Sequence, residues 1–357
     1  MLFATTHLHL PQGTGGIEVT THALCKSLIA RGNEPAVFCR LDQGGLFGLQ
    51  RRVMRKLASQ DVVEDQRCSY PVFRGWRLQE SARDVIGWFR PDVVVVQGVH
   101  SNELAKPFLR AGLPTVISFH THHPFDLDSE LAVARGLSFV ANSRFTASMH
   151  PEKKILDVIP PLIVREDYVV DSARTTALFV NPARGKGLGT VLDLARARSD
   201  VPFEIYESWR MKPEQRREAA ARCAKLPNVR WRRAVEDMRL AYCRAKLVLM
   251  PSEMETWGRM ASEGHISGIP TLASTRGALP DTVGPGGLCV SLEAPFRAWQ
   301  EAFSALWDDE ARYDSLREAA IRYSLRDEIQ VEHVIRRFSD VLERAAAREV
   351  ERTWAVT

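Results

Sequence analysis

Glu255 and Glu263 stand eight positions apart, with Gly258 between them. The apolar run 247–250 comes shortly before, and so short an apolar run is typical of a buried strand. The polar segment 252–257 leaves the end of that strand, and we expect a helix to begin near Gly258. Glu255 then lies in the turn, and Glu263 lies about two helical turns further on. Both carboxylates can therefore accept hydrogen bonds near the same edge of the fold.

The end of a strand in an open parallel sheet is a place where ligands bind. A helix that begins there directs its N–H groups and its positive dipole end at the ligand, which suits a phosphate. Carboxylates beside a phosphate are unfavourable unless they accept hydrogen bonds from other groups, and sugar hydroxyls are suitable donors. A nucleotide-sugar carries both kinds of group. The alternative is that both glutamates are surface charges, with Glu263 paired to Arg259.

Short apolar runs alternate with helical patterns twice along the chain. Their near-continuous Val, Ile and Leu content is typical of parallel sheets that are covered on both faces. The first series of expected strands comprises residues 2–6, 35–40, 92–97, 114–119 and 137–142. The second series comprises residues 177–180, 203–206, 229–231, 247–250, 270–273 and 288–290. The fold class predicted by this pattern is α/β, with two doubly wound parallel sheets.

The domain organisation follows from the same pattern. At 357 residues the chain is long for a single core, which favours two domains. The polar stretch 165–176 between the two series is the expected linker. We therefore expect one Rossmann-like domain over residues 1–165 and a second over residues 166–328. Residues 329–351 carry apolar side chains at helical spacing and predict a terminal helix.

The composition of the chain limits the cellular locations and the binding partners that we expect. The net charge of +4 is mild and does not by itself indicate nucleic acid. The six cysteines form no C-x-x-C pair, which fits reduced cytoplasmic thiols better than disulfides or a zinc site. We find no secretory leader, and no apolar segment approaches the ~18 residues that span a bilayer. We expect a cytoplasmic protein, soluble or peripheral on the inner face of the membrane.

The loop after the first expected strand contains two adjacent glycines, Gly15 and Gly16. This loop lacks the dinucleotide-binding fingerprint, because the third glycine of that pattern would fall on Glu18. An NAD site is therefore disfavoured. Adjacent glycines still permit close approach of a ligand to the backbone and conformations closed to other residues. The alternative is an ordinary tight turn.

Three histidines occur within four residues at the end of another expected strand: His120, His122 and His123. A metal site is disfavoured, because alternate residues of an extended segment point to opposite faces and no distant Cys/His pair completes a ligand set. His120 can contact a ligand at the strand end or can be a hydrogen-bonded core residue. Asp126 and Asp128 form a D-x-D pattern that is short enough to recur by chance, and we interpret it as an ordinary loop.

Cations follow the first strand of the second series. Arg184 and Lys186 stand among glycines before the helical pattern 188–198. Positive charge at such a turn stabilises the negative charge that develops on a leaving diphosphate. Arg184 either contributes to this site or points to solvent.

The segment 44–60 contains four cations and no acidic residue. Leu46, Leu49, Val53 and Leu57 fall on one side of the helix that it predicts. A basic amphipathic helix can lie on an anionic membrane surface. It can equally line a groove for an anionic acceptor, or it can be a surface helix whose apolar stripe packs on the protein.

The region from Val248 to Gly287 resembles the E-x7-E region of retaining glycosyltransferases. The resemblance is to family four of those enzymes, which have the GT-B fold, and it covers about forty residues. The residues that carry it are Pro251-Ser252, Glu255-Thr256-Trp257-Gly258-Arg259, Glu263, Ser267-Gly268-Ile269-Pro270, Gly277-Ala278-Leu279-Pro280 and Gly286-Gly287. The resemblance implies two Rossmann-like domains that face a cleft, with residues 329–357 crossing back to the first domain as a helix.

The resemblance also implies a function. It implies metal-independent transfer of a sugar from a nucleoside-diphosphate donor, a UDP-sugar being favoured, to a hydroxyl of a glycan, a glycolipid or a small metabolite. The anomeric configuration would be retained, with no cofactor and no covalent nucleophile. The catalytic residues implied are His120, near the reacting carbon, and Glu255, on the sugar hydroxyls. The donor-binding residues implied are Gly15, Gly16, Arg184, Lys186, Thr256, Trp257, Gly258, Arg259, Met260 and Glu263. Arg184 departs from the family pattern, since it lies closer to Lys186 than usual.

Three other functions remain open. A GT-B isomerase, epimerase or phosphorylase would share the architecture. A catalytically silent nucleotide-sugar-binding homologue would be expected to lack the acidic pair or the glycine loop, and both are present. Nucleic-acid binding is disfavoured, because basic residues are not interleaved with stacking aromatics outside 44–60.

Overall fold

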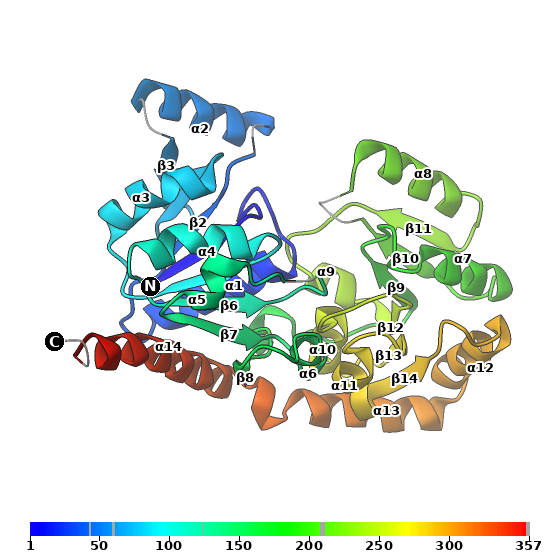
Figure 1. Ribbon diagram of the computed structural model, residues 1–357. Coiled ribbons are helices and arrows are strands. Elements are labelled where there is room, and N and C mark those ends of the chain that lie inside the picture. Colours follow the sequence, from blue (N-terminus) through cyan, green and yellow to red (C-terminus); the bar gives the residue numbers. More distant parts are fainter. Residues whose placement is uncertain (43, 59–60, 124, 208–210, 355–357) are drawn as a thin grey trace. The chain divides into compact units, whose positions relative to one another are not determined.

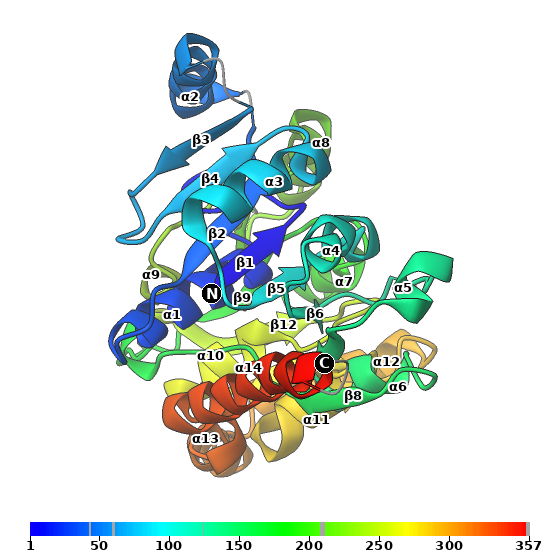
Figure 2. The same cartoon turned by 60° about the vertical axis from the view of Figure 1, so that its left-hand side comes forward.

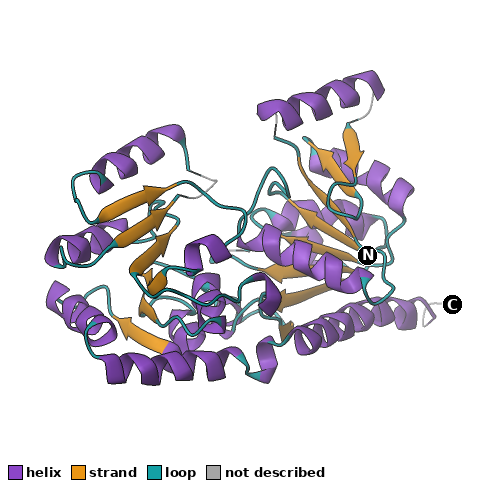
Figure 3. Cartoon of the chain, turned by 180° about the vertical axis from the view of Figure 1, so that it is seen from behind, coloured by secondary structure: helices purple, strands orange, loops and turns teal. Residues whose placement is uncertain are grey.

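The computed structural model describes residues 1–42, 44–58, 61–123, 125–207 and 211–354. The chain divides into two compact units (Figure 1). Unit 1 comprises Met1–Leu162 and Val331–Thr357, and unit 2 comprises Ile163–Gln330. In each unit, helices cover both faces of a layer of strands (Figure 3). The chain therefore passes from unit 1 to unit 2 between residues 162 and 163, and it returns between residues 330 and 331. These positions lie close to the expected boundaries 165/166 and 328/329.

The described residues of unit 1 form an eight-stranded sheet in the order β3-β4-β2-β1-β5-β6-β7-β8. All its pairs are parallel except β3 with β4. Its strands are β1 (Leu2–Thr5), β2 (Ala36–Arg40), β3 (Val62–Asp65), β4 (Val72–Gly75), β5 (Val94–Gln97), β6 (Thr115–Phe119), β7 (Leu137–Ala141) and β8 (Ile155–Val158). Its helices are α1 (Gly16–Ile29), α2 (Gly45–Ala58), α3 (Leu78–Phe89), α4 (Ser101–Arg110), α5 (Ser129–Val133), α6 (Arg144–Ser148) and α14 (Val331–Trp354).

The described residues of unit 2 form a six-stranded parallel sheet in the order β11-β10-β9-β12-β13-β14. Its strands are β9 (Thr176–Val180), β10 (Phe203–Tyr206), β11 (Val229–Arg232), β12 (Ala245–Met250), β13 (Thr271–Ser274) and β14 (Gly287–Val290). Its helices are α7 (Leu188–Ala197), α8 (Pro213–Cys223), α9 (Arg239–Tyr242), α10 (Arg259–Ile266), α11 (Leu279–Val283), α12 (Phe296–Trp307) and α13 (Glu310–Ser324). Short 3-10 turns occur at Arg165–Asp167, Gly284–Gly286 and Asp327–Ile329.

Alternation along the strands explains how each sheet buries both faces. In β1, Leu2 and Ala4 pack in the cluster formed with α3 and α4, whereas Phe3 packs in the cluster formed with α1 and α14. Successive side chains of a strand point to opposite faces, so a wholly apolar strand serves two cores. The predicted α/β class with two parallel sheets is therefore confirmed.

Every strand expected from the sequence is present to within two residues of its predicted ends. β3, β4 and β8 were not expected. β3 ends in Glu64 and Asp65, and β4 contains Arg74, so neither shows a continuous apolar run. Arg74 is nevertheless fully buried, because Asp65 accepts a hydrogen bond from its guanidinium group at 2.5 Å.

The order of the strands determines where each unit can bind a ligand. In unit 1 the chain leaves β1 towards β2 on one side and returns to β5 on the other. In unit 2, β9 stands in the same way between β10 and β12. Ligands of open α/β sheets bind beside the carboxyl ends of strands at such a reversal. We therefore expect the functional residues after β1 and β5, and after β9 and β12.

The terminal helix α14 belongs to unit 1, as the resemblance implied (Figure 2). Phe338 stacks on Phe3 of the first strand, with ring centroids 5.8 Å apart. Arg337 pairs with Asp157 in β8. The helix thus closes the core of a unit whose other elements lie at the opposite end of the sequence. None of the described helices is both long and apolar enough to cross a bilayer.

Replacing Phe338 with alanine tests this packing. We expect F338A to lower the free energy of unfolding of unit 1 by about 3 to 4 kcal/mol, because a large buried ring leaves a cavity. Denaturant titration, followed by circular dichroism, measures the change. Val133→Ala, at an exposed apolar residue of unit 1, is the control and should change stability by less than about 0.5 kcal/mol. Equal effects of the two substitutions would contradict the placement of α14.

Candidate functional site

Two loops of unit 2 meet at the reversal of its sheet. The β9–α7 loop contributes Lys186, and the β12–α10 loop contributes Glu255. The Lys186 Nζ atom donates to the Glu255 Oε1 atom at 2.6 Å. The Ser252 hydroxyl donates to the same carboxylate oxygen at 2.9 Å. Both members of the ion pair remain partly accessible, so the structure brings a cation and a carboxylate together where a ligand can reach them.

Glycine permits this approach of the two loops. Gly187 has φ +84°, and a Cβ atom there would lie 2.1 Å from the backbone oxygen of Pro251. Gly277 has φ +63°, and its Cβ atom would lie 2.0 Å from the backbone oxygen of Glu255. That oxygen accepts a hydrogen bond from the Ala278 N–H at 2.8 Å. A side chain at Gly187 would therefore separate the two loops that hold the ion pair, and a side chain at Gly277 would displace the backbone of Glu255.

Helix α10 begins at Arg259, directly after Gly258, which confirms the expected helix start. Glu263 lies on this helix and is buried. Its carboxylate accepts from the Arg259 Nε atom at 3.0 Å and from the Tyr242 hydroxyl at 2.8 Å. Arg259 also donates to the Tyr168 hydroxyl at 2.9 Å. The pairing of Glu263 with Arg259 that the alternative included is thus present, but Glu263 is buried in a hydrogen-bonded network and is not a surface charge.

The other candidates in unit 2 lie in different environments. Trp257 is buried, and its indole N–H donates to the Ser262 hydroxyl at 3.1 Å. Thr256 and Met260 are partly buried beside it. Arg184 is exposed. The structure therefore gathers Lys186, Glu255 and the start of α10, and it leaves Arg184 on the surface.

In unit 1, three segments bring polar side chains together after β1, β5 and β6. The His7 Nδ1 atom lies 3.4 Å from a carboxylate oxygen of Glu18 on the first turn of α1. Glu18 is only 1% exposed. The His120 Nε2 atom lies 2.9 Å from the Ser118 hydroxyl. Gly98, after β5, approaches the ring of His7 so closely that a Cβ atom would lie 3.1 Å from it.

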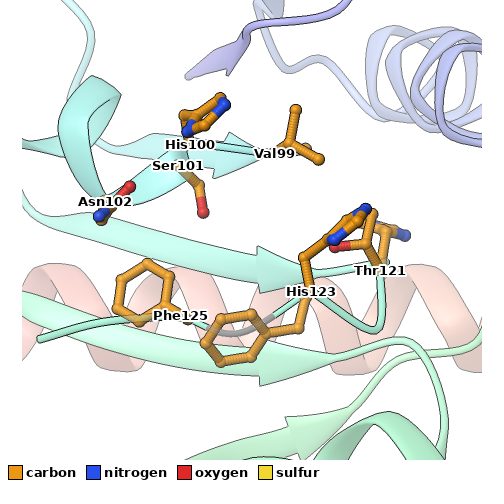
Figure 4. Close-up of a pocket in the computed structure, with 10 residues that line it drawn as sticks. Val99, His100, Ser101, Asn102, Thr121, His123 and Phe125 are labelled. Carbon is orange, nitrogen blue, oxygen red and sulfur yellow. The ribbon is translucent and has the colours of Figure 1, made fainter.

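A pocket opens beside His120 (Figure 4). Val99, His100, Ser101 and Asn102 line one side of it, at the start of α4, and Thr121, His123 and Phe125 line the other. Gly98, Phe119 and His120 complete its lining. Hydroxyl, amide and imidazole groups next to aromatic rings can hold a polar molecule with an apolar face.

Burial keeps His120 neutral. The pKa of His120 is lowered to about 4: burial is the largest cause, the nearby His7 adds to the lowering, and Glu18 opposes it. A neutral imidazole has one nitrogen that donates and one that accepts. At neutral pH His120 can thus form a hydrogen bond to a ligand hydroxyl without introducing a charge.

The two glycines of the loop do not use the conformational freedom that they permit. Gly15 caps the start of α1 with φ −75°, an extended conformation that any residue adopts. Neither Gly15 nor Gly16 has a positive φ. What remains of the interpretation is close approach of a ligand to Gly15 and Gly16, which lie one turn before the buried Glu18.

The D-x-D pattern has a structural explanation. Asp128 caps helix α5, accepting hydrogen bonds from the N–H groups of Glu130 and Leu131. Its carboxylate also pairs with the Lys106 Nζ atom at 2.7 Å.

The histidines after β6 contact each other: the ring centroids of His122 and His123 are 4.8 Å apart, and the rings stack. Within the described residues, no group of three His, Cys, Asp or Glu side chains is arranged to hold a metal.

Several polar residues at these sites were not singled out from the sequence: His7, Glu18, Tyr168, Tyr242 and Ser252. Glu18 carried a usable signal, since it is an acid in the first turn of a helix that starts at a Gly-Gly pair. Ser252 follows a strand just before Glu255. Tyr168 and Tyr242 lie far from α10 in the sequence and carried no local signal.

Gly187→Ala tests the close approach of the loops. We expect it to destabilise unit 2 by at least about 2 kcal/mol more than Gly185→Ala, because overpacking adds to backbone strain. Gly185 is a matched control, since it has φ +80° in the same loop but its Cβ atom would meet only the Glu253 carboxylate at 3.4 Å. Denaturant unfolding of both variants gives the difference. Equal losses would show that the contact with Pro251 is unimportant.

The lowered histidine pKa values predict a pH dependence. Burial also lowers the pKa of His9 and of His265 to about 3. Below the usual pKa of 6.5, the unfolded chain binds protons at these histidines and the native protein does not. Stability should therefore fall as the pH drops from 6.5 towards 4, by up to roughly 1.4 kcal/mol per pH unit for each histidine. Unfolding titrations at pH 7 and pH 5 measure it, and His120→Gln should reduce the loss. An unchanged loss in that variant would contradict the burial of a neutral His120.

Known proteins support a family assignment. Residues 14–163 match the family model described as Glycosyltransferase Family 4, and residues 193–309 match the model described as Glycosyl transferases group 1. A D-inositol 3-phosphate glycosyltransferase of Corynebacterium kroppenstedtii is 34% identical over 96 residues, which are 26% of this chain and 21% of that protein. An MMP alpha-(1->4)-mannosyltransferase of Mycolicibacterium hassiacum is 26% identical over 242 residues, which are 55% of this chain and 58% of that protein. The chain thus spans about a fifth of the first relative and little more than half of the second.

A solved structure extends the likeness to the whole fold. Anabaena HepE in complex with UDP-glucose matches with a TM-score of 0.75 and 14% identity, over 96% of this chain and 99% of that chain. At this identity the match shows the fold alone, two parallel-sheet α/β domains of the GT-B type. Since the two family models together extend over most of both units, the chain belongs to the family-four glycosyltransferases.

Proposed function

We propose that the protein transfers a sugar from a nucleoside-diphosphate-sugar to a hydroxyl group of an acceptor, with retention of the anomeric configuration and without a metal ion. The observation that carries this proposal is the contact between Lys186 and Glu255 at the reversal of the unit 2 sheet. Membership of family four supports the reaction class. The two groups match the two parts of such a donor, an anionic diphosphate and a sugar rich in hydroxyls.

Lys186 faces the diphosphate in this proposal. When the bond from the anomeric carbon to the β-phosphate oxygen breaks, negative charge develops on that phosphate. A cation beside it lowers the free energy of the transition state more than that of the ground state. The start of α10, from Trp257 to Met260, adds N–H groups and the positive end of a helix dipole. Arg184 contributes only if its exposed side chain turns towards the phosphates.

Glu255 accepts hydrogen bonds from hydroxyls of the donor sugar. Its carboxylate already accepts from Lys186 and Ser252, and these contacts orient it. An ionised carboxylate has about four acceptor positions, so sugar hydroxyls can be added. Glu263 accepts from ribose hydroxyls in the same way, although Arg259 and Tyr242 already occupy one position on each of its oxygens.

For unit 1 we propose that His120 contacts the donor sugar near its reacting carbon, and that Gly15 and Gly16 lie against the donor phosphates. The neutral state of His120 suits this role, since a neutral imidazole can form a hydrogen bond to a sugar hydroxyl without adding a charge. The acceptor oxygen bonds to the anomeric carbon as the phosphate oxygen leaves on the same face. The acceptor proton passes to that phosphate oxygen, so no protein nucleophile is required.

A UDP-sugar is the donor we favour, which the UDP-glucose bound to HepE supports. The acceptor is a glycan, a glycolipid or a small hydroxylated metabolite. The named relatives, an inositol-phosphate glycosyltransferase and a mannosyltransferase, fall within that range. We also propose a cytoplasmic location with peripheral membrane contact through residues 44–60, for which the geometry of α2 is described in the next subsection.

Glu255→Ala tests the catalytic assignment. We expect transfer to fall by at least about 100-fold, because an interaction that strengthens in the transition state is lost. The fold should persist, since Glu255 lies in a loop and is partly accessible. Product formation from a radiolabelled donor measures the rate, and circular dichroism measures the fold. Glu253→Ala, two residues earlier at an exposed position, is the control and should keep near-normal activity.

Near-normal turnover of Glu255→Ala would refute the role of this residue. A wild-type protein that interconverts the donor sugar, or that releases a sugar phosphate, would instead identify an isomerase or a phosphorylase. A protein that binds donor but never turns it over would be a silent homologue.

Donor binding provides a separate prediction. A thermal-shift panel of UDP-, GDP- and ADP-sugars should show one nucleotide that raises the melting temperature, since a ligand that binds only the native state stabilises it by mass action. Lys186→Ala should abolish most of that shift. Absence of any shift across the panel would contradict a nucleotide-sugar site.

A further inference from the structure

Helix α2 lies at the β3 edge of the unit 1 sheet (Figures 1 and 2). Its contact face is built around Phe47. The guanidinium groups of Arg51, Arg67 and Arg74 lie 5.3, 4.7 and 5.1 Å from the centre of the Phe47 ring. Arg51 also donates to the backbone oxygen of Glu64 in β3 at 3.2 Å. These contacts hold α2 in one rotational orientation on the unit.

That orientation turns the aliphatic stripe of the helix outward. Leu46 is 88% exposed, Leu49 45%, Val53 49% and Met54 44%. Leu46, Leu49 and Val53 are spaced by three and four residues, so they lie on one side of the helix. Leu57, which the sequence places on the same stripe, has a side chain outside the described residues, as do residues 59 and 60. A surface helix ordinarily turns such a stripe to the core. The interpretation that the stripe packs on the protein is therefore wrong.

Cations accompany the stripe. Arg52 and Lys56 are exposed, each three residues after a member of the stripe, and the helix has no acidic residue. Helix α8 of unit 2 provides a contrast. It is also polar and exposed, but Glu214 and Glu218 offset two of its three arginines, and it has no exposed large aliphatic side chain.

We infer that α2 is a docking surface for a bilayer that contains anionic lipids. In this arrangement the helix lies in the interface, with Leu46, Leu49 and Val53 at the boundary of the acyl chains and Arg52 and Lys56 at the level of the phosphates. Such a surface fits an aliphatic stripe that is flanked by cations. This inference rests on the peripheral membrane contact proposed above and deepens it by assigning the face of α2 and the class of lipid. It does not depend on the donor site of unit 2.

Vesicle sedimentation tests the docking surface with the full chain. We expect the wild-type protein to sediment with vesicles of phosphatidylcholine mixed with phosphatidylglycerol, and to stay in solution with phosphatidylcholine alone. Salt should weaken the binding, because ions screen the attraction between the cations and the headgroups. Arg52→Ala with Lys56→Ala should weaken it roughly 25-fold, at about 5-fold for each cation near the surface.

The aliphatic stripe is tested separately. Leu49→Gln with Val53→Gln should reduce vesicle binding by at least about 10-fold, because less apolar area enters the interface. Its melting temperature should remain that of the wild type, since both side chains are exposed. The matched controls are Arg217→Ala with Arg222→Ala on α8, and Val133→Gln with Leu240→Gln at exposed sites elsewhere. Both controls should bind vesicles like the wild type.

Three outcomes would overturn the inference. The first is a wild-type protein that stays in solution with anionic vesicles. The second is dimerisation in sedimentation velocity that is lost in Leu49→Gln with Val53→Gln, which would assign the stripe to a second copy of the chain. The third is vesicle binding that the α2 variants leave unchanged. The thermal shift with donor, measured in the same variants, shows separately whether the nucleotide-sugar site is intact.

Discussion

The close contact between two loops of unit 2 is the constraint on which the candidate site depends. Lys186 reaches Glu255 only because the backbone at Gly187 lies against the oxygen of Pro251. A side chain at that glycine would occupy the position of the Pro251 oxygen and move the loops apart. The parallel sheet supplies the other condition, because it brings the carboxyl ends of β9 and β12 side by side. The pairing of charges is therefore a consequence of backbone geometry.

The sheet of unit 1 has a similar reversal of strand order, but different side chains lie beside it. Its reversal lies between β1 and β5, and the side chains gathered there are imidazoles and the buried carboxylate of Glu18, near the Gly-Gly start of α1. Burial keeps His120 neutral, whereas Lys186 of unit 2 pairs with the Glu255 carboxylate. Two sheets of one architecture thus carry different groups at their reversals, a polar pocket beside His120 in unit 1 and the Lys186–Glu255 pair in unit 2. Phe338 of α14 completes the core of unit 1 from the far end of the chain.

Much of this organisation could be predicted from the sequence, because strands buried on both faces show continuous apolar runs. The same reasoning placed Glu255 and Lys186 at strand ends, where parallel topology brings them together. Contacts between residues that are distant in the sequence could not be predicted. For example, the Tyr242 hydroxyl reaches the Glu263 carboxylate only in the folded unit. The outward rotation of α2 depends on the contacts of Phe47 with Arg67 and Arg74, which no local pattern contains. A periodic pattern identifies an apolar stripe, but it does not tell which way the stripe faces.

The most direct test of a donor site at Lys186 and Glu255 is a crystal structure of the protein with a bound UDP-sugar. We expect the Lys186 ammonium to lie within hydrogen-bond distance of a β-phosphate oxygen. The Glu255 carboxylate should accept from hydroxyls of the sugar, and Glu263 should accept from the ribose. A nucleotide bound away from the β9–α7 and β12–α10 loops would contradict this donor site, and Lys186 would then still be paired only to Glu255.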